Sequence, residues 1–333
     1  MIKTLIKTLH YSTSVIQQNI GVLNSTKWLS AILVIFLLTG CEAPLNLAGI
    51  KQESAKSIRR TDQFQAVASN QEVIAVVGFD GLILTSSKHN LNWHRQVLEQ
   101  RPNFVDIDAC PDHSFIALSM EHQLWRSSDQ GKNWEKIEIP TQEDLISITC
   151  GPDNSYWASG SFSTLVSSTN QGESWHENTL NEDAFITQIQ FLNNNTLLAI
   201  GEFGLVARSV DSGKNWTTQD PLPNEFFSQG SYFKDVNTGW VAGLGGVILN
   251  TTDSGATWKI QSTPTQSPLF GFYANNSRLF AFGDHGTVLE FNDKTWQRVE
   301  MPRIPVYLRD GLQINDHQLI VVGGWGALFP INI

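Results

Sequence analysis

The stretch Ser127–Trp134, SSDQGKNW, decides the fold because the chain repeats it. It returns as SSTNQGESW at Ser167–Trp175, SVDSGKNW at Ser209–Trp216 and TTDSGATW at Thr251–Trp258. Six tryptophans keep the same period, with spacings of 41, 41, 41, 42 and 38 residues: Trp93, Trp134, Trp175, Trp216, Trp258 and Trp296. A fixed period near 40 residues is typical of propellers and other repeat arrays.

The segments between the tryptophans have the pattern of strands. Short apolar runs alternate with Gly, Asn, Asp and Ser, as in EVIAVVGFDGLILTSS at Glu72–Ser87. Runs of about four to six residues rich in Val, Ile, Leu and Phe, bounded by turn residues, predict strands. Four antiparallel strands in one period make one propeller blade.

A Gly-x-x-Gly pattern recurs about twelve residues before each tryptophan, and the number of its copies gives the number of blades. Two such glycines suit a hairpin that needs positive φ. The copies lie at Gly78–Gly81, Gly201–Gly204, Gly243–Gly246, Gly283–Gly286 and Gly323–Gly326, with degenerate copies at Ser119–His122 and Gly160–Ser163. The sequence therefore predicts an all-β, seven-bladed β-propeller of four-stranded antiparallel blades.

The last blade, from about Val306, has no tryptophan-led fourth strand. We expect Ile50–Arg60 to supply that strand and to close the ring, because closure removes free sheet edges. An open ring and an eight-bladed ring remain as alternatives.

The repeated turn resembles the Asp-box, or BNR repeat. Its Asp or Asn accepts hydrogen bonds from its own turn, its Gly takes positive φ, and its Trp buries a large ring against the neighbouring sheet. We expect these residues to stabilise the fold rather than to bind metal or substrate, because some copies of the turn have lost residues of the pattern, as a repeated structural element can. They are Asp129, Gly131, Trp134, Asn170, Gly172, Trp175, Asp211, Gly213, Trp216, Asp253, Gly255 and Trp258.

Asp-boxes occur in sialidases, sortilin-type receptors and the photosystem II stability/assembly factor family. The passage GWVAGLGGVILNTTDSGATWKIQSTP at Gly239–Pro264 resembles the third, and the resemblance extends from about Phe64 to Ile333. It implies a seven-bladed, non-catalytic scaffold without a cofactor, which in oxygenic phototrophs binds newly made reaction-centre protein. That family uses a patch of arginines, whereas the arginines here fall at mixed positions in different blades and form no evident patch: Arg95, Arg101, Arg126, Arg208, Arg278, Arg298, Arg303 and Arg309.

The N-terminal region has the pattern of a lipoprotein leader. Trp28–Leu38 is an apolar run of eleven residues, whereas a spanning helix needs about 20. Leu38–Cys41, LTGC, ends that run and resembles a lipobox, which implies cleavage before Cys41 and a lipid on its sulfur. We therefore expect a signal peptide at 1–40, a lipidated tether at 41–60 and the propeller at 61–333. The protein would be exported and anchored on the periplasmic side of the outer or inner membrane, and Glu42 after the cysteine favours the outer one.

Charge excludes some partners. The leader holds three of the 22 basic residues and none of the 32 acidic ones, which leaves the mature chain a net charge of about −13. Nucleic acid is therefore a poor partner. No motif of metal ligands is present, so we expect no metal, and we expect a monomer.

Cys110 and Cys150 lie at equivalent positions late in the inner strands of adjacent blades. Export would place them in an oxidising compartment. A disulfide between blades two and three is one expectation, and two buried free thiols are the other.

The hairpins carry residues that differ from blade to blade, which suits recognition of a partner. We expect Phe79, Phe203 and Trp325 to anchor a protein partner in the cell envelope, unless these rings fold back onto the blades. The function indicated is a non-catalytic, lipid-anchored scaffold that assists a membrane complex or transporter. The alternative is an exported carbohydrate-active or carbohydrate-binding propeller, since Pro302–Pro305, PRIP, resembles an Arg-Ile-Pro element of sialidases.

Overall fold

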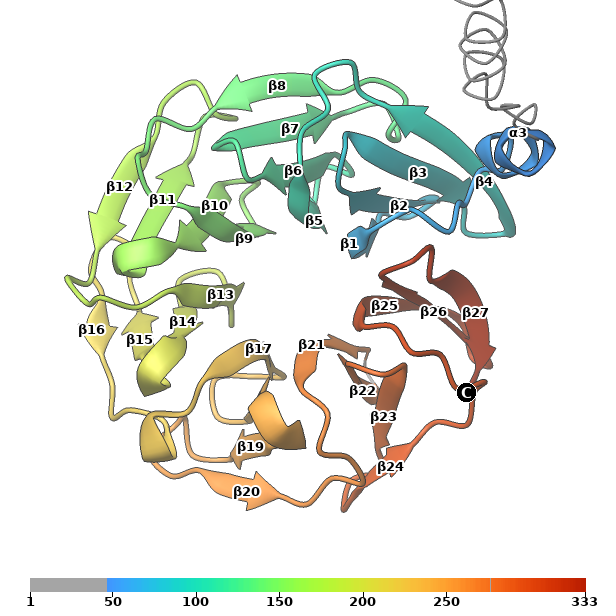
Figure 1. Ribbon diagram of the computed structural model, residues 1–333. Helices are drawn as coiled ribbons and strands as arrows, with labels where there is room; N and C mark the ends of the chain where they lie inside the picture. The colour runs from blue at the N-terminus through green and yellow to red at the C-terminus, as the bar shows by residue number, and fades with distance from the viewer. Residues whose placement is uncertain (1–46, 276) are drawn as a thin grey trace, which may run out of the picture. The chain divides into compact units, whose positions relative to one another are not determined.

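The computed structural model describes residues 47–275 and 277–333. The chain divides into the units Met1–Gln52 and Glu53–Ile333, and the second contains all the strands described. These strands form seven antiparallel sheets arranged as blades around a central axis (Figure 1), so the predicted seven-bladed propeller is confirmed. Six sheets have four strands and the last has three.

The strands follow the order of the chain within each blade. Blade 1 has β1 (Phe64–Ser69), β2 (Val73–Gly78), β3 (Leu82–Ser87) and β4 (Asn90–Val97); blade 2 has β5 (Phe104–Ala109), β6 (Phe115–Ser119), β7 (Gln123–Ser127) and β8 (Glu135–Glu138); blade 3 has β9 (Leu145–Cys150), β10 (Tyr156–Gly160), β11 (Thr164–Ser168) and β12 (His176–Thr179). Blade 4 has β13 (Ile186–Phe191), β14 (Leu197–Gly201), β15 (Val206–Ser209) and β16 (Thr217–Thr218); blade 5 has β17 (Ser228–Phe233), β18 (Gly239–Gly243), β19 (Ile248–Thr251) and β20 (Lys259–Gln261). Blade 6 has β21 (Leu269–Ala274), β22 (Leu279–Gly283), β23 (Thr287–Phe291) and β24 (Trp296–Arg298); blade 7 has β25 (Leu308–Asn315), β26 (Gln318–Gly323) and β27 (Leu328–Asn332).

Helical segments are short. The α-helix α3 spans Ala48–Ser54, and the single-turn 3₁₀ segments are η2 (Ser161–Ser163), η3 (Glu202–Gly204), η4 (Pro223–Glu225) and η5 (Leu244–Gly246). No helix in the part of the chain that the structure describes is long and apolar enough to cross a membrane. The predicted leader and Cys41 lie outside the described residues.

The second strand of each blade is apolar on both faces because it is packed between two neighbouring blades. In β2, Ala75 and Val77 pack in a cluster with residues of blade 2, whereas Ile74 and Val76 pack in a cluster with residues of blade 7. Successive side chains of a strand point to opposite faces of its sheet. The continuous run VIAVVG is therefore the pattern required of a strand buried on both sides.

The prediction that Ile50–Arg60 forms a closing strand is wrong. Ala48–Ser54 is helix α3, and the sheet of blade 7 contains only β25, β26 and β27. Ala, Lys, Gln and Glu dominate this segment, and these residues favour a helix over a strand. Packing of blade 1 against blade 7 closes the ring instead, in the cluster that contains Ile74 and Val76.

A short segment before β1 completes this closure. The amide of Gly326 donates to the carbonyl oxygen of Asp62 at 2.8 Å. The Asp62 carboxylate in turn accepts two hydrogen bonds from the Arg95 guanidinium, at 2.9 and 3.0 Å, and one from the Arg59 amide at 2.7 Å. Because the Asp62 side chain is only 4% exposed, this turn is fixed where the first and last blades meet.

Candidate functional site

The hairpins between the second and third strands lie at one end of the ring, together with the loops that connect successive blades. This face is called the hairpin face below. The repeated turns, between the third and fourth strands, lie at the opposite end because the strands are antiparallel.

The two glycines of each hairpin have different roles. Gly81 has a φ of +70°, and Asp80 before it has a φ of +63°. Gly78, by contrast, ends β2, and a Cβ atom there would collide with the carbonyl oxygen of Gln63. The first glycine is therefore explained by close approach of backbone, and the second by the left-handed conformation.

Backbone hydrogen bonds hold the hairpins on both sides. In blade 1 the Phe79 amide donates to the Gln63 carbonyl at 3.1 Å, and the Gly81 amide donates to the Pro102 carbonyl at 2.7 Å. Blade 7 repeats this arrangement with the Gly324 amide on the carbonyl of Tyr307, at 3.1 Å, and with the Gly326 bond described above. The side chains at the hairpin tips are thus presented on fixed backbone.

These tips carry a ring of exposed apolar side chains, called the apolar ring below. Its members, one on each of six blades, are Phe79, Met120, Phe162, Phe203, Leu244 and Trp325, with exposures of 37%, 56%, 56%, 55%, 51% and 70%. The structure places the predicted Phe79, Phe203 and Trp325 on this face, and all three rings are exposed. Phe79 is the second residue of its hairpin, whereas Phe203 and Trp325 are the third residue of theirs. Met120 was missed because blade 2 has lost both hairpin glycines.

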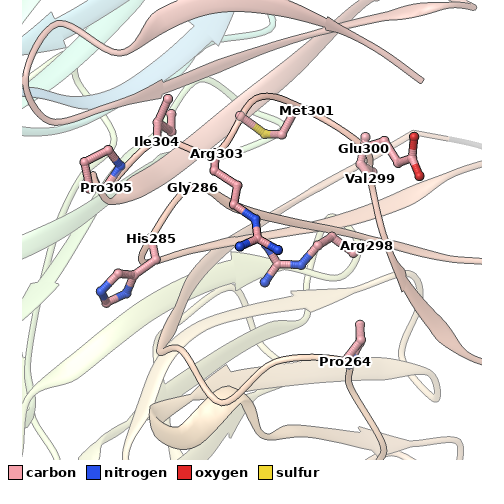
Figure 2. A pocket seen from close by; sticks show the side chains of 10 residues that line it. All are labelled: Pro264, His285, Gly286, Arg298, Val299, Glu300, Met301, Arg303, Ile304 and Pro305. Carbon is pink, nitrogen blue, oxygen red and sulfur yellow. The ribbon is translucent and has the colours of Figure 1, made fainter.

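The hairpin face also contains a basic pocket at blade 6, with a volume of about 1080 Å³. Figure 2 shows the side chains of Arg298 and Arg303 extending into this pocket, with His285 at its edge and Glu300 pointing away. In residues 47–275 and 277–333, neither arginine lies within 4.0 Å of a carboxylate. The sequence indicated no arginine patch, so this pair is a correction: Arg298, the last residue of β24, and Arg303, in the segment that follows, line one pocket.

The central channel, about 270 Å³, is lined by the inner strands and contains partly buried carboxylates. Asp106 of β5 accepts a hydrogen bond from the Ile148 amide of β9 at 2.8 Å, and Asp310 of β25 accepts one from the Val67 amide of β1 at 3.0 Å. Burial raises the pKa of Asp106 to about 7, that of Asp310 to about 6, and also that of Asp108. These side chains join neighbouring blades. The sequence analysis missed them, although acids within the apolar strand FVDIDA were a signal.

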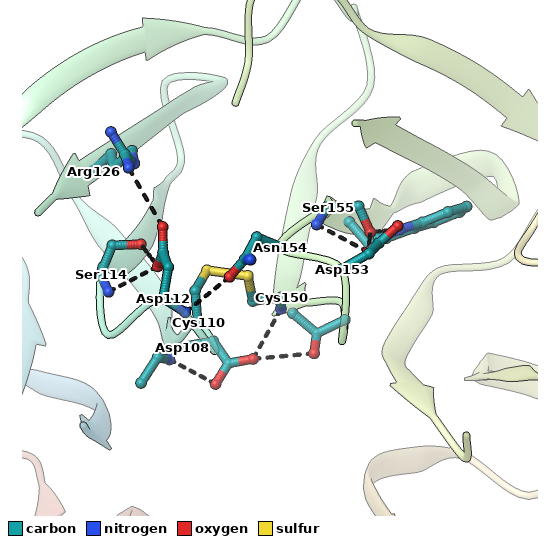
Figure 3. The surroundings of a disulfide bond; sticks show 12 residues. Asp108, Cys110, Asp112, Ser114, Arg126, Cys150, Asp153, Asn154 and Ser155 are labelled. Atoms are coloured by element: carbon teal, nitrogen blue, oxygen red, sulfur yellow. Dashed lines mark hydrogen bonds and ion pairs between the residues drawn. A yellow bond between two sulfur atoms is a disulfide. The ribbon is translucent and has the colours of Figure 1, made fainter. Parts of the chain in front are cut away.

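A disulfide joins Cys110 and Cys150, whose Cα atoms are 5.2 Å apart (Figure 3). Both cysteines lie at the end of an inner strand remote from the hairpin face. The Asp108 carboxylate accepts a hydrogen bond from the Cys150 amide at 2.9 Å, and the Asp112 amide donates to the Asn154 side chain at 2.9 Å. Blades 2 and 3 are therefore linked covalently and by hydrogen bonds at this end.

In the repeated turn the aspartate carboxylate accepts hydrogen bonds from residues of the same turn. The Asp211 carboxylate accepts hydrogen bonds from the Asn215 side chain and amide and from the Ser209 hydroxyl, and these bonds lower its pKa to about 2. Gly213 has a φ of +78° and lies against the ring of Trp157 in blade 3. The hydrogen bond from the amide four residues later recurs at Asp129, Asn170 and Asp253. No cluster of metal-ligating side chains occurs among the described residues.

Comparisons with known proteins agree with the propeller fold. Residues 113–241, less than half of the chain, match the model of the DUF6242 beta propeller domain. No curated protein matches the sequence.

Solved structures resemble the chain over 82% of its length. They include YCF48 from Cyanidioschyzon merolae (15% identity, 96% of that chain covered, TM-score 0.67) and YCF48 bound to D1 peptide (13%, 92%, 0.67). Virginiamycin B lyase from Staphylococcus aureus, an enzyme, is equally similar (12%, 94%, 0.70). At such low identity these likenesses show the fold alone.

Proposed function

We propose that this protein is a non-catalytic, lipid-anchored scaffold that binds a protein partner in the cell envelope through its hairpin face. The observation that carries the proposal is the apolar ring, six exposed apolar side chains at the tips of hairpins on one face of the propeller. Aromatic residues and methionine, which make up five of these six side chains, are enriched at protein interfaces.

The similar structures support a partner of peptide character. One of them is YCF48 bound to D1 peptide, so a propeller of this shape accommodates a peptide. By analogy, this chain would bind a segment of a membrane complex or transporter and assist its assembly or function.

Export and anchoring form the second part of the proposal. The disulfide between Cys110 and Cys150 suits an oxidising compartment outside the cytoplasm. The lipid would be attached to Cys41, and the chain enters the ring at Asp62, beside the hairpin of blade 7. Labelling with radioactive palmitate should modify the wild-type protein and not a Cys41→Ala variant.

Cross-linked co-purification from membranes tests the binding face. The variant would combine Phe79→Ala with Phe203→Asn and Trp325→Asn, because the last two residues have φ values of +54° and +56° that asparagine tolerates. Partner recovery should fall at least about tenfold, since interface anchors are worth more than about 1.4 kcal/mol. Val210→Ala is the matched control, because Val210 is equally exposed but lies in a repeated turn on the opposite face.

Unchanged recovery with the triple variant, at an unchanged melting temperature, would reject this face as the binding surface. Release of sugar from a panel of sialosides by the wild-type protein would reject the non-catalytic assignment.

A further inference from the structure

Three consecutive blades carry a pocket at the same place on the rim of the hairpin face. Each pocket is formed by a hairpin and by the blade-connecting loops beside it, and the pockets of blades 4, 5 and 6 measure about 240, 260 and 1080 Å³. The three pockets have the same position because the blades repeat, whereas the side chains that line them differ from blade to blade. Along the rim the lining is acidic at blade 4, apolar at blade 5 and basic at blade 6.

The blade 5 pocket is apolar. Phe226, Phe227, Leu244, Val247 and Ile260 contribute to its lining, and no charged side chain does. Leu244 and Ile260 are 51% and 67% exposed. Covering these side chains would remove apolar surface from water, which is favourable by about 25 cal/mol for each Å². The pocket therefore has the size and lining for one large apolar side chain.

The blade 4 pocket, on one side of it, has acidic walls over an apolar floor. Glu182, Asp183 and Glu202 lie around a floor that includes Leu205 and Val206. Within residues 47–275 and 277–333, none of the three carboxylates lies within 4.0 Å of a basic side chain. A lysine or arginine could cover the apolar floor with its stem and pair its charge with this wall.

The blade 6 pocket, on the other side, has the opposite charge. It contains Arg298 and Arg303, which have no carboxylate partner among the described residues, and His285 stands at its edge (Figure 2). Two guanidinium groups suit a carboxylate, which they bind through paired hydrogen bonds. The apolar pocket is thus flanked by charges of opposite sign.

We propose that an extended segment of the partner protein lies along the rim over blades 4 to 6. It places a large apolar side chain in the blade 5 pocket, a basic side chain toward Glu182 and an acidic side chain toward Arg298. This inference rests on the proposed function, because it specifies the chemistry of the partner that the hairpin face binds. Because the flanking pockets of blades 4 and 6 have opposite charge, they select a segment with a basic and an acidic side chain on either side of the apolar one. Segments with a single sign of charge would bind more weakly.

Synthetic fluorescent peptides test the proposal with the purified full-length protein. The first probe has a lysine pair, a central tryptophan and an aspartate pair, separated by short Ser-Gly spacers. Two others carry lysine pairs or aspartate pairs at both ends, and a fourth has serine in place of tryptophan. Fluorescence anisotropy should show the first probe binding at least about tenfold more tightly than each of the others, and high salt should weaken it.

Reversing the charge of the blade 6 pocket should create a new binding preference. A misfolded protein would lose binding and would not gain such a preference, so this result would not be caused by misfolding. The double variant Arg298→Glu/Arg303→Glu should bind the lysine–tryptophan–lysine probe more tightly than the mixed-charge probe, reversing the wild-type preference. Ile260→Ser should weaken every probe that contains tryptophan and leave the ranking by charge unchanged.

Equal binding of all charge patterns, or no reversal in the double variant, would overturn the inference. If the apolar ring is needed for co-purification while the probes show no charge preference, the partner binds elsewhere on the hairpin face. The proposed function then stands and the rim inference fails.

Discussion

The channel carboxylate Asp106 should make the folded protein less stable as pH rises. Its pKa is about 7 in the folded protein and 3.8 in the unfolded chain. Between these values the folded state holds a proton that the unfolded state has lost. The contribution to unfolding free energy is therefore fully present below about pH 3.8 and is lost as pH rises to about 7.

The pKa shift sets the size of this effect. A difference of about 3 pKa units, at 1.36 kcal/mol for each, gives an upper bound of about 4 kcal/mol. Asp106 faces the channel and remains partly accessible to water, which weakens the effect of burial. We therefore expect stability to fall by about 2 kcal/mol between about pH 5 and pH 8, a large part of a typical total of about 5–15 kcal/mol.

Urea denaturation, followed by tryptophan fluorescence at a series of pH values, measures how the free energy of unfolding changes with pH. The control is Asp106→Asn, which does not titrate and keeps only one of the two oxygens that accept from the Ile148 and Ile107 amides. This variant should be less stable than the wild type at about pH 5, by about 1–3 kcal/mol, and the difference should shrink or reverse at about pH 8. A wild-type slope equal to that of the variant would refute the assignment of the proton to Asp106.

Four further variants test the parts that hold the ring together. Replacing Cys110 and Cys150 by alanine removes a link across 40 residues and should cost about 4 kcal/mol in urea denaturation, without changing binding at the remote hairpin face. Asp62→Ala leaves the partly buried Arg95 guanidinium without its carboxylate and should cost about 2–3 kcal/mol, less than the cost of breaking a fully buried pair, whereas Asp80→Ala breaks an exposed ion pair and should cost less than about 1 kcal/mol. Gly213→Ala adds a Cβ at positive φ against a tryptophan ring and should lower the melting temperature by several degrees, since strain and overpacking each cost about 1 kcal/mol or more.

The repeat made most of the fold predictable from sequence. The recurring turn and hairpin determine where strands end, and the apolar runs between them need burial on both sides. A period of about 40 residues then leaves little choice except blades around an axis. The closure of the ring between blades 1 and 7 was not predictable in the same way. Asp62 contributes to it through its backbone carbonyl and through a salt bridge with Arg95, and neither interaction leaves a pattern in the sequence.

The candidate site was predictable only where it follows the repeat. Phe79, Phe203 and Trp325 each lie between the two glycines of a hairpin, so their exposure could be anticipated. Arg298 is the last residue of β24 and Arg303 lies in the segment that follows it, and only the path of that segment brings both into one pocket. The carboxylates of the channel were missed for a related reason, since their amide partners belong to the neighbouring blade.

Site-specific photo-cross-linking tests the central claim, that the hairpin face binds the partner. Benzoyl-phenylalanine would replace Phe203 on the hairpin face or Val210 on the opposite face, and each full-length protein would be irradiated in cells. The account predicts a discrete cross-linked product of higher mass from position 203 and none from position 210. Cross-links from position 210 alone would contradict it.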